Sequence, residues 1–260
     1  MNTAIVIPAR FASKRLPGKP LISIAGKTLI ERTWRIASTV YGVNRVIVAT
    51  DDQRIFDAVK EFGGEAMMTD PNHSNGSERV FEVATRLDPR PEVVLNLQGD
   101  APLVPPWIPG ALIDEMRSDP DVRLATPVVR LNWNEFGKMS ESRASGKAGG
   151  TLAVFDQYRD ALYFSKGMIP FPRKRDIDPP PLFRHIGLYA YRYETLERYV
   201  GLEATPLEKM EGLEQLRALE HGIPIRCVEV DYRGRTAWSV DKPEDVPAVE
   251  EIIAREGELT

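Results

Sequence analysis

The sequence predicts an α/β fold with a mostly parallel sheet that is covered by helices on both faces. In the first half of the chain, short apolar runs alternate with helical patterns, and this alternation is typical of a parallel sheet. The first apolar run, residues 4–7, opens directly into a basic loop. Open α/β sheets bind ligands at the carboxyl ends of their strands, so the loop marks a candidate binding site.

The composition fits a globular protein and excludes several other classes. The chain of 260 residues is 42% apolar and 28% charged, which allows one large domain or two small ones. A formal charge of −4 argues against a general nucleic-acid binder. The single cysteine, Cys227, rules out intrachain disulfides and fits a reducing compartment. No signal segment opens the chain and no apolar run is long enough to cross a membrane, so we expect a cytoplasmic protein without a membrane partner.

The first half of the chain has clear start and stop signals. Thr28 is expected to cap a helix over residues 29–40, which Gly42 ends. Further strands are expected at residues 45–50, 65–68, 92–97 and 124–129. Further helices are expected at residues 54–62, 77–87 and 108–117.

The second half is less regular. Residues 135–150 are polar and contain glycine, which predicts a mobile loop, and the proline-rich residues 169–183 cannot be regular throughout. Strands are expected at 151–155, 161–164, 187–193 and 225–230, and helices at 193–200, 207–220 and the C-terminal end. The composition shifts near Leu131. We therefore expect one domain over residues 1–260, with a smaller lobe formed by about residues 131–235.

The basic loop after the first strand has the composition of a polyphosphate site. Pro8 is expected to end the strand, because proline has no N–H for the next ladder hydrogen bond. The residues that follow include the cations Arg10, Lys14, Arg15 and Lys19. Such a loop is usually only solvated surface, but its place at the end of a buried strand favours phosphate binding, where guanidinium groups form bidentate contacts.

Two common glycine-rich phosphate motifs are absent from the sequence. Residues 25–28 (AGKT) resemble the end of a Walker A loop, but its first glycine would fall at Leu21. No G-x-G-x-x-G motif follows a strand. We therefore expect a nucleotide site built from arginine and lysine.

Two aspartates are candidate metal ligands. Asp100 follows the strand at 92–97 and faces the same sheet edge as the basic loop, and Asp241 follows another apolar run. Mg²⁺ takes one or two carboxylates together with phosphate oxygens and water. In isolation, Asp100 could simply form a turn, and Asp241 could cap the C-terminal helix.

The order of motifs resembles the cytidylyltransferase family that makes CMP-activated 3-deoxy-manno-octulosonate (Kdo). The motifs are IPARFASKRLPGKPL, HSNGSERV, NLQGDAPLV, ALYFS, RHIGLYAYR, TPLEKMEGLEQLR and SVDKPEDV. The resemblance implies a nucleotide-binding sheet of the nucleotide-diphospho-sugar transferase type, with a smaller lobe for the sugar and for dimerisation. It also implies that CMP passes from CTP to the anomeric hydroxyl of the sugar acid, with Mg²⁺ as cofactor and a homodimer as the assembly. The resemblance further implies that pyrophosphate is released and that the product serves lipopolysaccharide synthesis.

The resemblance also implies the roles of individual residues. The implied CTP-binding residues are Pro8, Ala9, Arg10, Arg15, Lys19, Ser74, Gly76 and Asp100. The implied sugar-binding residues are Arg79, Gln98, Lys166, His185, Tyr189, Glu211 and Gln215. Asp100 and Asp241 are expected to bind Mg²⁺, and together with Arg10 and Lys19 to form the catalytic set.

Several of these side chains also have an ordinary structural interpretation. Arg79 could be a solvated helix residue, and His185 and Tyr189 could be core residues. Glu211 and Gln215 are four residues apart, so on one helix they would share a face.

Three features depart from the family pattern, and two of them lie in residues 140–166. Lys166 replaces an arginine, Ala101 replaces the usual glutamate, and the segment before residue 161 is longer. We therefore expect the sugar to be Kdo or a close relative such as its 8-amino-8-deoxy form. The alternatives are a nucleotidyltransferase for another acidic sugar or a phosphorylated alcohol, and a non-catalytic nucleotide-binding regulator.

Overall fold

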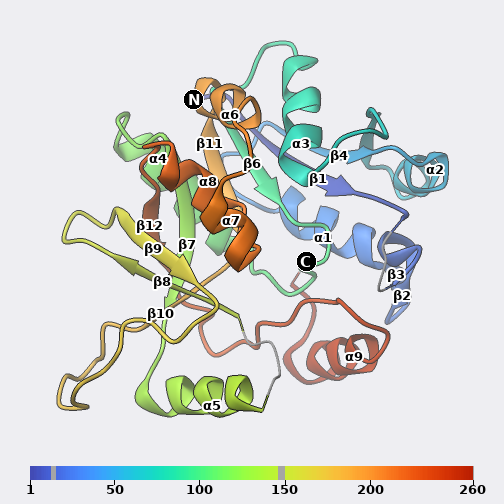
Figure 1. The fold of residues 1–260 in the computed structure, drawn as a ribbon. Coiled ribbons are helices and arrows are strands. Elements are labelled where there is room, and N and C mark those ends of the chain that lie inside the picture. The colour runs from blue at the N-terminus through green and yellow to red at the C-terminus, as the bar shows by residue number, and fades with distance from the viewer. Residues whose placement is uncertain (13–15, 146–149, 260) are drawn as a thin grey trace.

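One large sheet organises the protein. The computed structural model describes residues 1–12, 16–145 and 150–259. In this part of the chain the strand order is β5-β4-β1-β6-β11-β7-β10-β8-β9, with β12 beside β7 (Figure 1). The strands are β1 (Thr3–Ala9), β4 (Arg45–Thr50), β5 (Glu65–Met68), β6 (Val93–Leu97), β7 (Leu124–Arg130), β8 (Thr151–Phe155), β9 (Ala161–Ser165), β10 (Phe183–His185), β11 (Leu188–Arg192) and β12 (Arg226–Glu229). A separate hairpin joins β2 (Ser23–Ile24) to β3 (Lys27–Thr28).

The sheet is mostly parallel, as the sequence predicts. β1 lies between β4 and β6 and is parallel to both. β11 is antiparallel to its neighbours β6 and β7, with Leu188 opposite Leu97 at the carboxyl end of β6. The carboxyl ends of β1 and β6 and the start of β11 therefore meet at one edge of the sheet, where ligands of open α/β sheets bind.

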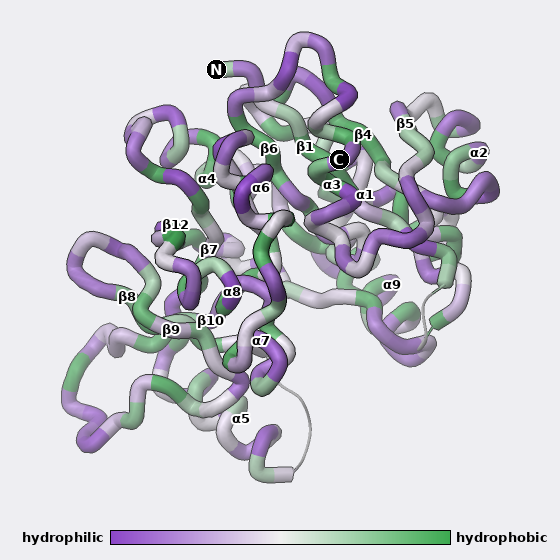
Figure 2. Tube along the Cα trace, turned by 45° about the horizontal axis from the view of Figure 1, so that its top comes forward, coloured by the Kyte–Doolittle hydropathy of each residue, from purple (hydrophilic) through white to green (hydrophobic). Residues whose placement is uncertain are grey.

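Helices cover both faces of the sheet (Figure 1). They are α1 (Leu29–Ser38), α2 (Gln53–Glu61), α3 (Gly76–Thr85), α4 (Trp107–Ser118), α5 (Trp133–Ala144), α6 (Tyr193–Val200), α7 (Pro206–Glu211), α8 (Gln215–Glu220) and α9 (Asp245–Glu256). One face of the sheet packs on α3, α6 and α8, and the other packs on α1, α2 and α4. Alternate residues of β1 serve the two faces, because successive strand side chains point in opposite directions. Val6 belongs to the first core and Ile5 to the second. Figure 2 shows the hydrophobic strands inside and the hydrophilic loops outside.

Capping side chains fix the starts of the first helices. Thr28, Asp52 and Asn75 accept hydrogen bonds from backbone N–H groups at the starts of α1, α2 and α3, which satisfies donors that have no partner within the helix. The predicted helices of the first half are all confirmed, with ends shifted by a few residues. No helix in the described ranges is long and apolar enough to cross a membrane.

The predicted mobile loop at 135–150 is wrong for most of its length. Residues up to Ala144 belong to α5, which begins with a capping box between Asn132 and Glu135. The N-x-x-E pattern is a helix start signal, and the polar composition concealed it. Phe136 packs with Leu152 in a small core of its own, which holds α5 against the sheet. Residues 146–149 lie outside the described part of the chain.

The predicted helix at 207–220 is also wrong, because two short helices replace it. Gly212 ends α7 with a φ of 62°, and α8 starts only at Gln215. Glycine adopts this left-handed conformation readily, so it ends a helix here instead of continuing it. Glu211 and Gln215 therefore do not share one helix face.

Pro8 does not end the first strand as expected. β1 continues to Ala9, and Pro8 stays in register with Ala49 of β4. The pairing of β1 with β6 already ends at Val6, so Pro8 lies where the sheet opens.

At the end of the sheet opposite β5, the strands β10, β8 and β9 extend the same sheet above α5 (Figure 1). The lobe boundaries at about 131–235 stay a prediction.

Candidate active site

One lysine and two aspartates from distant parts of the sequence meet at the sheet edge. Lys19 begins the short 3-10 helix η1 (Lys19–Leu21), Asp100 follows β6, and Asp241 precedes α9. The Lys19 ammonium lies 2.8 Å from Asp100 Oδ2 and 3.2 Å from Asp241 Oδ1. The Lys19 side chain is 13% exposed, so this contact is only partly screened by water. The two predicted metal ligands are thus within reach of a single cation, and two carboxylates are a suitable protein ligand set for Mg²⁺.

Close backbone packing positions the Asp100 turn. A Cβ atom on Gly99 would lie 3.0 Å from the Pro8 carbonyl oxygen, so a larger residue would push this turn away from the end of β1. The Val240 N–H donates a 3.0 Å hydrogen bond to the Asp100 carbonyl. The backbones of the two aspartate loops are therefore tied directly together.

Asp245 organises the loop that carries Asp241. Its Oδ2 accepts hydrogen bonds from the N–H groups of Asp241 at 2.7 Å and Lys242 at 2.8 Å, and its Oδ1 accepts one from Trp238 Nε1 at 3.1 Å. Partial burial tends to raise the pKa of Asp245, but the hydrogen bonds from Asp241 and Lys242 outweigh it and lower that pKa. The sequence analysis missed this residue, although acids in a first helical turn are a known signal.

A pocket of about 220 Å³ lies between the end of β1 and the Asp100 turn. Its lining residues are Pro8, Ala9, Arg10, Ala12, Lys19, Pro20, Gln98, Gly99 and Asp100. Most of the predicted CTP-binding residues therefore come together here, while Arg15 lies outside the described residues. Arginine and lysine beside a glycine turn can bind phosphate oxygens by charge-assisted hydrogen bonds.

The loop that carries Ser74 and Gly76, two of the predicted CTP-binding residues, lies beside the same pocket. Arg10 Nη2 donates a 2.6 Å hydrogen bond to the His73 carbonyl, which places the loop beside the basic pocket. The Ser74 N–H donates to Glu78 Oε2. A Cβ atom on Gly76 would lie 3.3 Å from the Pro8 ring, so a small residue lets the start of α3 approach β1.

A second pocket of about 320 Å³ adjoins the first through Gln98 and Asp100, which line both. Its lining residues are Leu97, Gln98, Asp100, Ala101, Val104, Arg184, His185, Ile186, Gly187, Leu188, Tyr232, Ala237, Trp238 and Ser239. Of the predicted sugar-binding residues, Gln98 and His185 line it. Arg184 and Trp238 were missed, although Arg184 directly precedes His185 in the sequence.

His185 is a buried neutral group. Its Nε2 is hydrogen-bonded to Thr126 Oγ1 at 2.8 Å. Because that hydroxyl donates its own proton to the Leu188 carbonyl, Nε2 is the donor and Nδ1 remains an acceptor. Burial lowers the pKa of His185 to about 3. His185 can therefore accept a hydrogen bond from a hydroxyl, but it cannot supply positive charge near neutral pH.

Four further sugar-site candidates form two pairs. Tyr189 donates a 3.0 Å hydrogen bond to Gln215 Oε1, and both side chains are buried. Glu211 accepts hydrogen bonds from the Ser165 hydroxyl and from the Lys166 N–H. The pairs lie where α7 and α8 pack near β9 and β11. Neither pair is among the described residues that line the two pockets.

Arg79 is buried in a structural contact and does not face either pocket. Its side chain is 0% exposed and pairs with Asp51 at 2.8 Å and with Thr69. Burial, the largest influence, lowers the pKa of Arg79 although Asp51 opposes that change. In this arrangement Asp51 and Thr69 occupy the guanidinium group of Arg79. Arg79 therefore holds α3 to the end of β4, and its sugar-binding role stays a prediction.

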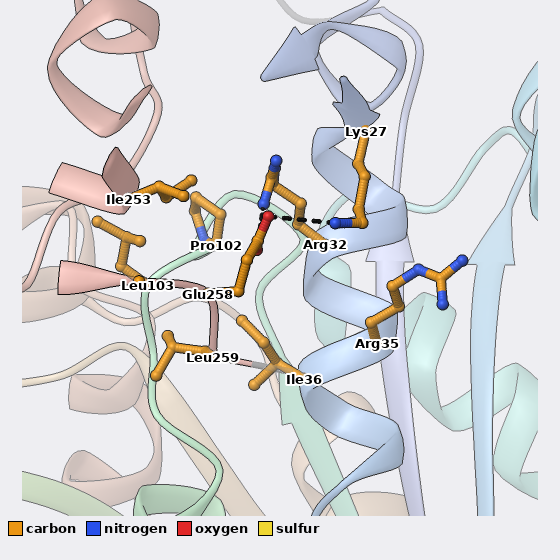
Figure 3. Close-up of a pocket in the computed structure, with 10 residues that line it drawn as sticks. Lys27, Arg32, Arg35, Ile36, Pro102, Leu103, Ile253, Glu258 and Leu259 are labelled. Carbon is orange, nitrogen blue, oxygen red and sulfur yellow. Dashed lines mark hydrogen bonds and ion pairs between the residues drawn. The ribbon is translucent and has the colours of Figure 1, made fainter. Parts of the chain in front are cut away.

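Ion pairs join the C-terminal tail to the first half of the chain (Figure 3). Glu258 binds Arg32 Nη1 at 2.7 Å and Lys27 Nζ at 3.1 Å, and Arg32 also donates to the Ile24 and Ala25 carbonyls. The space beside these residues is about 10 Å³, enough for roughly one water molecule. The ion pairs therefore hold the end of α9 in place. The space beside them is too small to bind a substrate.

Comparison with known proteins gives one consistent family. Residues 4–226 match the model of a family described as "Cytidylyltransferase". A 3-deoxy-manno-octulosonate cytidylyltransferase of Maricaulis maris is 56% identical over all of both chains. One of Chlamydia pneumoniae is 44% identical and covers 95% of this chain and 92% of its own. A solved structure of CMP:2-keto-3-deoxy-manno-octonic acid synthetase complexed with CTP superposes with a TM-score of 0.86, at 38% identity, over 98% of this chain and 100% of that chain.

Proposed function

The chain belongs to the cytidylyltransferase family, and on this premise we propose that it transfers CMP from CTP to the anomeric hydroxyl of 3-deoxy-manno-octulosonate and releases pyrophosphate. The meeting of Lys19, Asp100 and Asp241 beside a basic pocket carries this proposal. A second pocket shares Asp100 with the first, so an acceptor and a nucleotide can meet at one carboxylate. The names and full-length identities of the relatives support the choice of sugar.

The residues of the first pocket suit an in-line transfer of the nucleotidyl group. Arg10 and Lys19 offset the charge of the triphosphate and of the departing pyrophosphate. Gln98 and His185 border the second pocket, where a polyhydroxylated sugar would find hydrogen-bonding groups. The protein's contribution is to position both substrates and stabilise charge, since the sugar hydroxyl itself is the nucleophile.

We propose Mg²⁺ as the cofactor, held by Asp100 and Asp241. Both carboxylates already share one cation, Lys19, and hard oxygen ligands of this kind suit the ion. When bound, the ion would supply Lewis-acid polarisation of the phosphate. The chain's own part is to hold the two carboxylates together through the Val240–Asp100 and Asp245–Asp241 hydrogen bonds.

Pyrophosphate release from CTP tests this function. We expect release with Kdo, and none with a sugar 1-phosphate or without an acceptor. CTP binding without release for any acceptor would favour a regulator. A rate with Kdo that equals or exceeds the rate with the 8-amino relative would remove the case for an amino-sugar specialist, while a much higher rate with the 8-amino form would establish it.

The assembly and cellular role are also proposals. We propose a homodimer in the cytoplasm that supplies activated Kdo for lipopolysaccharide synthesis, as the family resemblance implies. The exposed Leu162 and Phe171 side chains on the β8–β10 side support a contact between subunits there. Light scattering during size-exclusion chromatography would show twice the chain mass of 29.2 kDa if the dimer forms.

A further inference from the structure

Arg184 is the cation of the second pocket. Among the described residues that line this pocket, it is the one side chain with a full positive charge, since His185 is neutral. No ion pair or side-chain hydrogen bond joins Arg184 to another described residue. Other arginines in the protein have carboxylate partners, such as Arg217 with Glu208. An arginine in a pocket without a protein partner is available for an anionic ligand.

The fold holds Arg184 firmly. Its backbone lies in β10, in register with Val129 of β7 on one side and Leu152 of β8 on the other. Its aliphatic stem passes Gly150, where a Cβ atom would lie 3.4 Å from Arg184 Cδ. Burial raises the pKa of Tyr232, and the positive charge of Arg184 opposes that rise. The charge of the guanidinium group is thus felt at Tyr232, which lines the same pocket.

The rest of the pocket limits what the anion can be. Its walls include apolar residues such as Leu188 and Val104, and the Trp238 indole is oriented by Asp245. The pocket reaches Asp100, which also lines the phosphate pocket. A fitting ligand has one carboxylate beside apolar carbon and a reacting group close to that carboxylate. A 3-deoxy sugar acid meets this description, because its carboxylate and its C3 methylene are both attached to the anomeric carbon.

We propose that Arg184 binds the carboxylate of the sugar acid and thereby directs the anomeric hydroxyl toward Asp100 and the phosphate pocket. This inference rests on the proposed function and specifies how its acceptor is recognised. Two other cations are poorer candidates. Arg79 is buried with Asp51, and the Lys166 ammonium lies 3.4 Å from the Gly212 carbonyl outside the pocket.

Kinetics of Arg184→Gln and Arg184→Lys test the proposal. In Arg184→Gln we expect KM for the sugar acid to rise about 10- to 100-fold, because a charge-assisted pair is lost, while KM for CTP stays within about twofold. Arg184→Lys keeps the charge but loses the bidentate fork, so its KM should fall between these values. Arg173→Gln makes the same charge change at an exposed site and should behave as wild type.

A binding measurement separates carboxylate recognition from a general effect on the pocket. The probes are a 2-deoxy analogue of the sugar acid, which lacks the attacking hydroxyl, and the carboxamide of that analogue. The wild-type protein should prefer the acid, and Arg184→Gln should bind both alike with an unchanged melting temperature. Retention of the full preference, or an unchanged KM for the sugar, would overturn the role of Arg184. If the wild-type protein itself released no pyrophosphate with any sugar acid, the proposed function would fail instead.

Discussion

The Lys19 ammonium lies 2.8 Å from the Asp100 carboxylate, and the Asp241 carboxylate shares the same ammonium at 3.2 Å. Two carboxylates that contact the same ammonium group repel each other, so the positive charge of Lys19 stabilises them as a pair. Lys19 also lines the phosphate pocket. One side chain therefore connects the proposed metal site with the proposed triphosphate site.

Replacing Lys19 should affect both CTP binding and the pair of carboxylates. In Lys19→Met we expect KM for CTP to rise about 10- to 100-fold, because a charge-assisted phosphate contact is lost. The unneutralised carboxylates should also make the melting temperature more sensitive to Mg²⁺ than that of wild type, which thermal unfolding with and without the ion would measure. Lys242→Met, at an exposed neighbouring lysine, is the matched control. Equal Mg²⁺ shifts in both variants would contradict the shared role of Lys19.

Asp245 should affect metal binding by positioning Asp241, without contacting the substrate itself. Asp245→Ala removes the acceptor of the Asp241 and Lys242 N–H groups, so the Mg²⁺ concentration for half-maximal rate should rise about tenfold or more, as for other residues that orient metal ligands. Titration of the rate with Mg²⁺ measures this change.

The control for this change is Glu244→Ala, because Glu244 makes no capping hydrogen bond at the start of α9. A similar loss of melting temperature in both variants, without a change in Mg²⁺ dependence, would reduce Asp245 to an ordinary structural residue.

The burial of His185 predicts a pH dependence of stability. Its pKa is about 3 in the folded protein and about 6.5 in an unfolded chain. Below that unfolded value, the unfolded chain binds a proton that the folded protein does not bind. The free energy of unfolding should therefore fall as pH decreases from about 6.5 toward 3, by about 1.4 kcal/mol per pH unit.

Urea unfolding between about pH 5 and 7.5 measures this slope in His185→Gln, which cannot take up the proton. The variant should lose most of the pH dependence in this range, whereas His221→Gln, at an exposed helix end, should keep it. Identical slopes in His185→Gln and wild type would show that His185 is not buried as a neutral ring.

The ion pairs of Glu258 with Arg32 and Lys27, here called the C-terminal clamp, should affect the stability of the protein and leave its turnover unchanged. Glu258→Gln leaves the Arg32 side chain, which is 3% exposed, without its carboxylate partner. Because Glu258 is itself 39% exposed, we expect only about 1 kcal/mol of destabilisation, or roughly 2–4 °C in melting temperature. Glu251→Gln, on an exposed position of α9, should be neutral. An unchanged melting temperature in Glu258→Gln would refute the clamp.

The first half of the fold could be predicted from the sequence because the residues that define its helices and strands are close together in the chain. Apolar runs such as residues 45–50 and caps such as Thr28 lie within a few residues of the elements that they define. The helix at 133–144 was missed because its capping box was outweighed by its polar composition. The break at Gly212 was missed because glycine is also tolerated inside helices.

The site was predictable only where charge and strand ends coincide. Lys19 and Asp100 follow β1 and β6, which are neighbours in a parallel sheet, so their meeting was expected. The motif around Arg79 does not show that Asp51 lies near, so the buried ion pair of Arg79 was not predicted. Arg184 shares its pocket with residues that are far away in the chain, and a single sequence does not show such contacts. The partners of Asp245 are only three to seven residues away, but the helix start signal does not show which N–H groups its carboxylate binds.

Turnover of Asp100→Asn is the most direct test of the central claim that the Asp100–Asp241 pair drives cytidylyl transfer. The substitution keeps the size of the side chain and removes the charge. We predict that pyrophosphate release from CTP with Kdo falls by about 1,000-fold or more, while the melting temperature and the far-UV circular dichroism stay those of wild type. Wild-type turnover in Asp100→Asn would contradict the account.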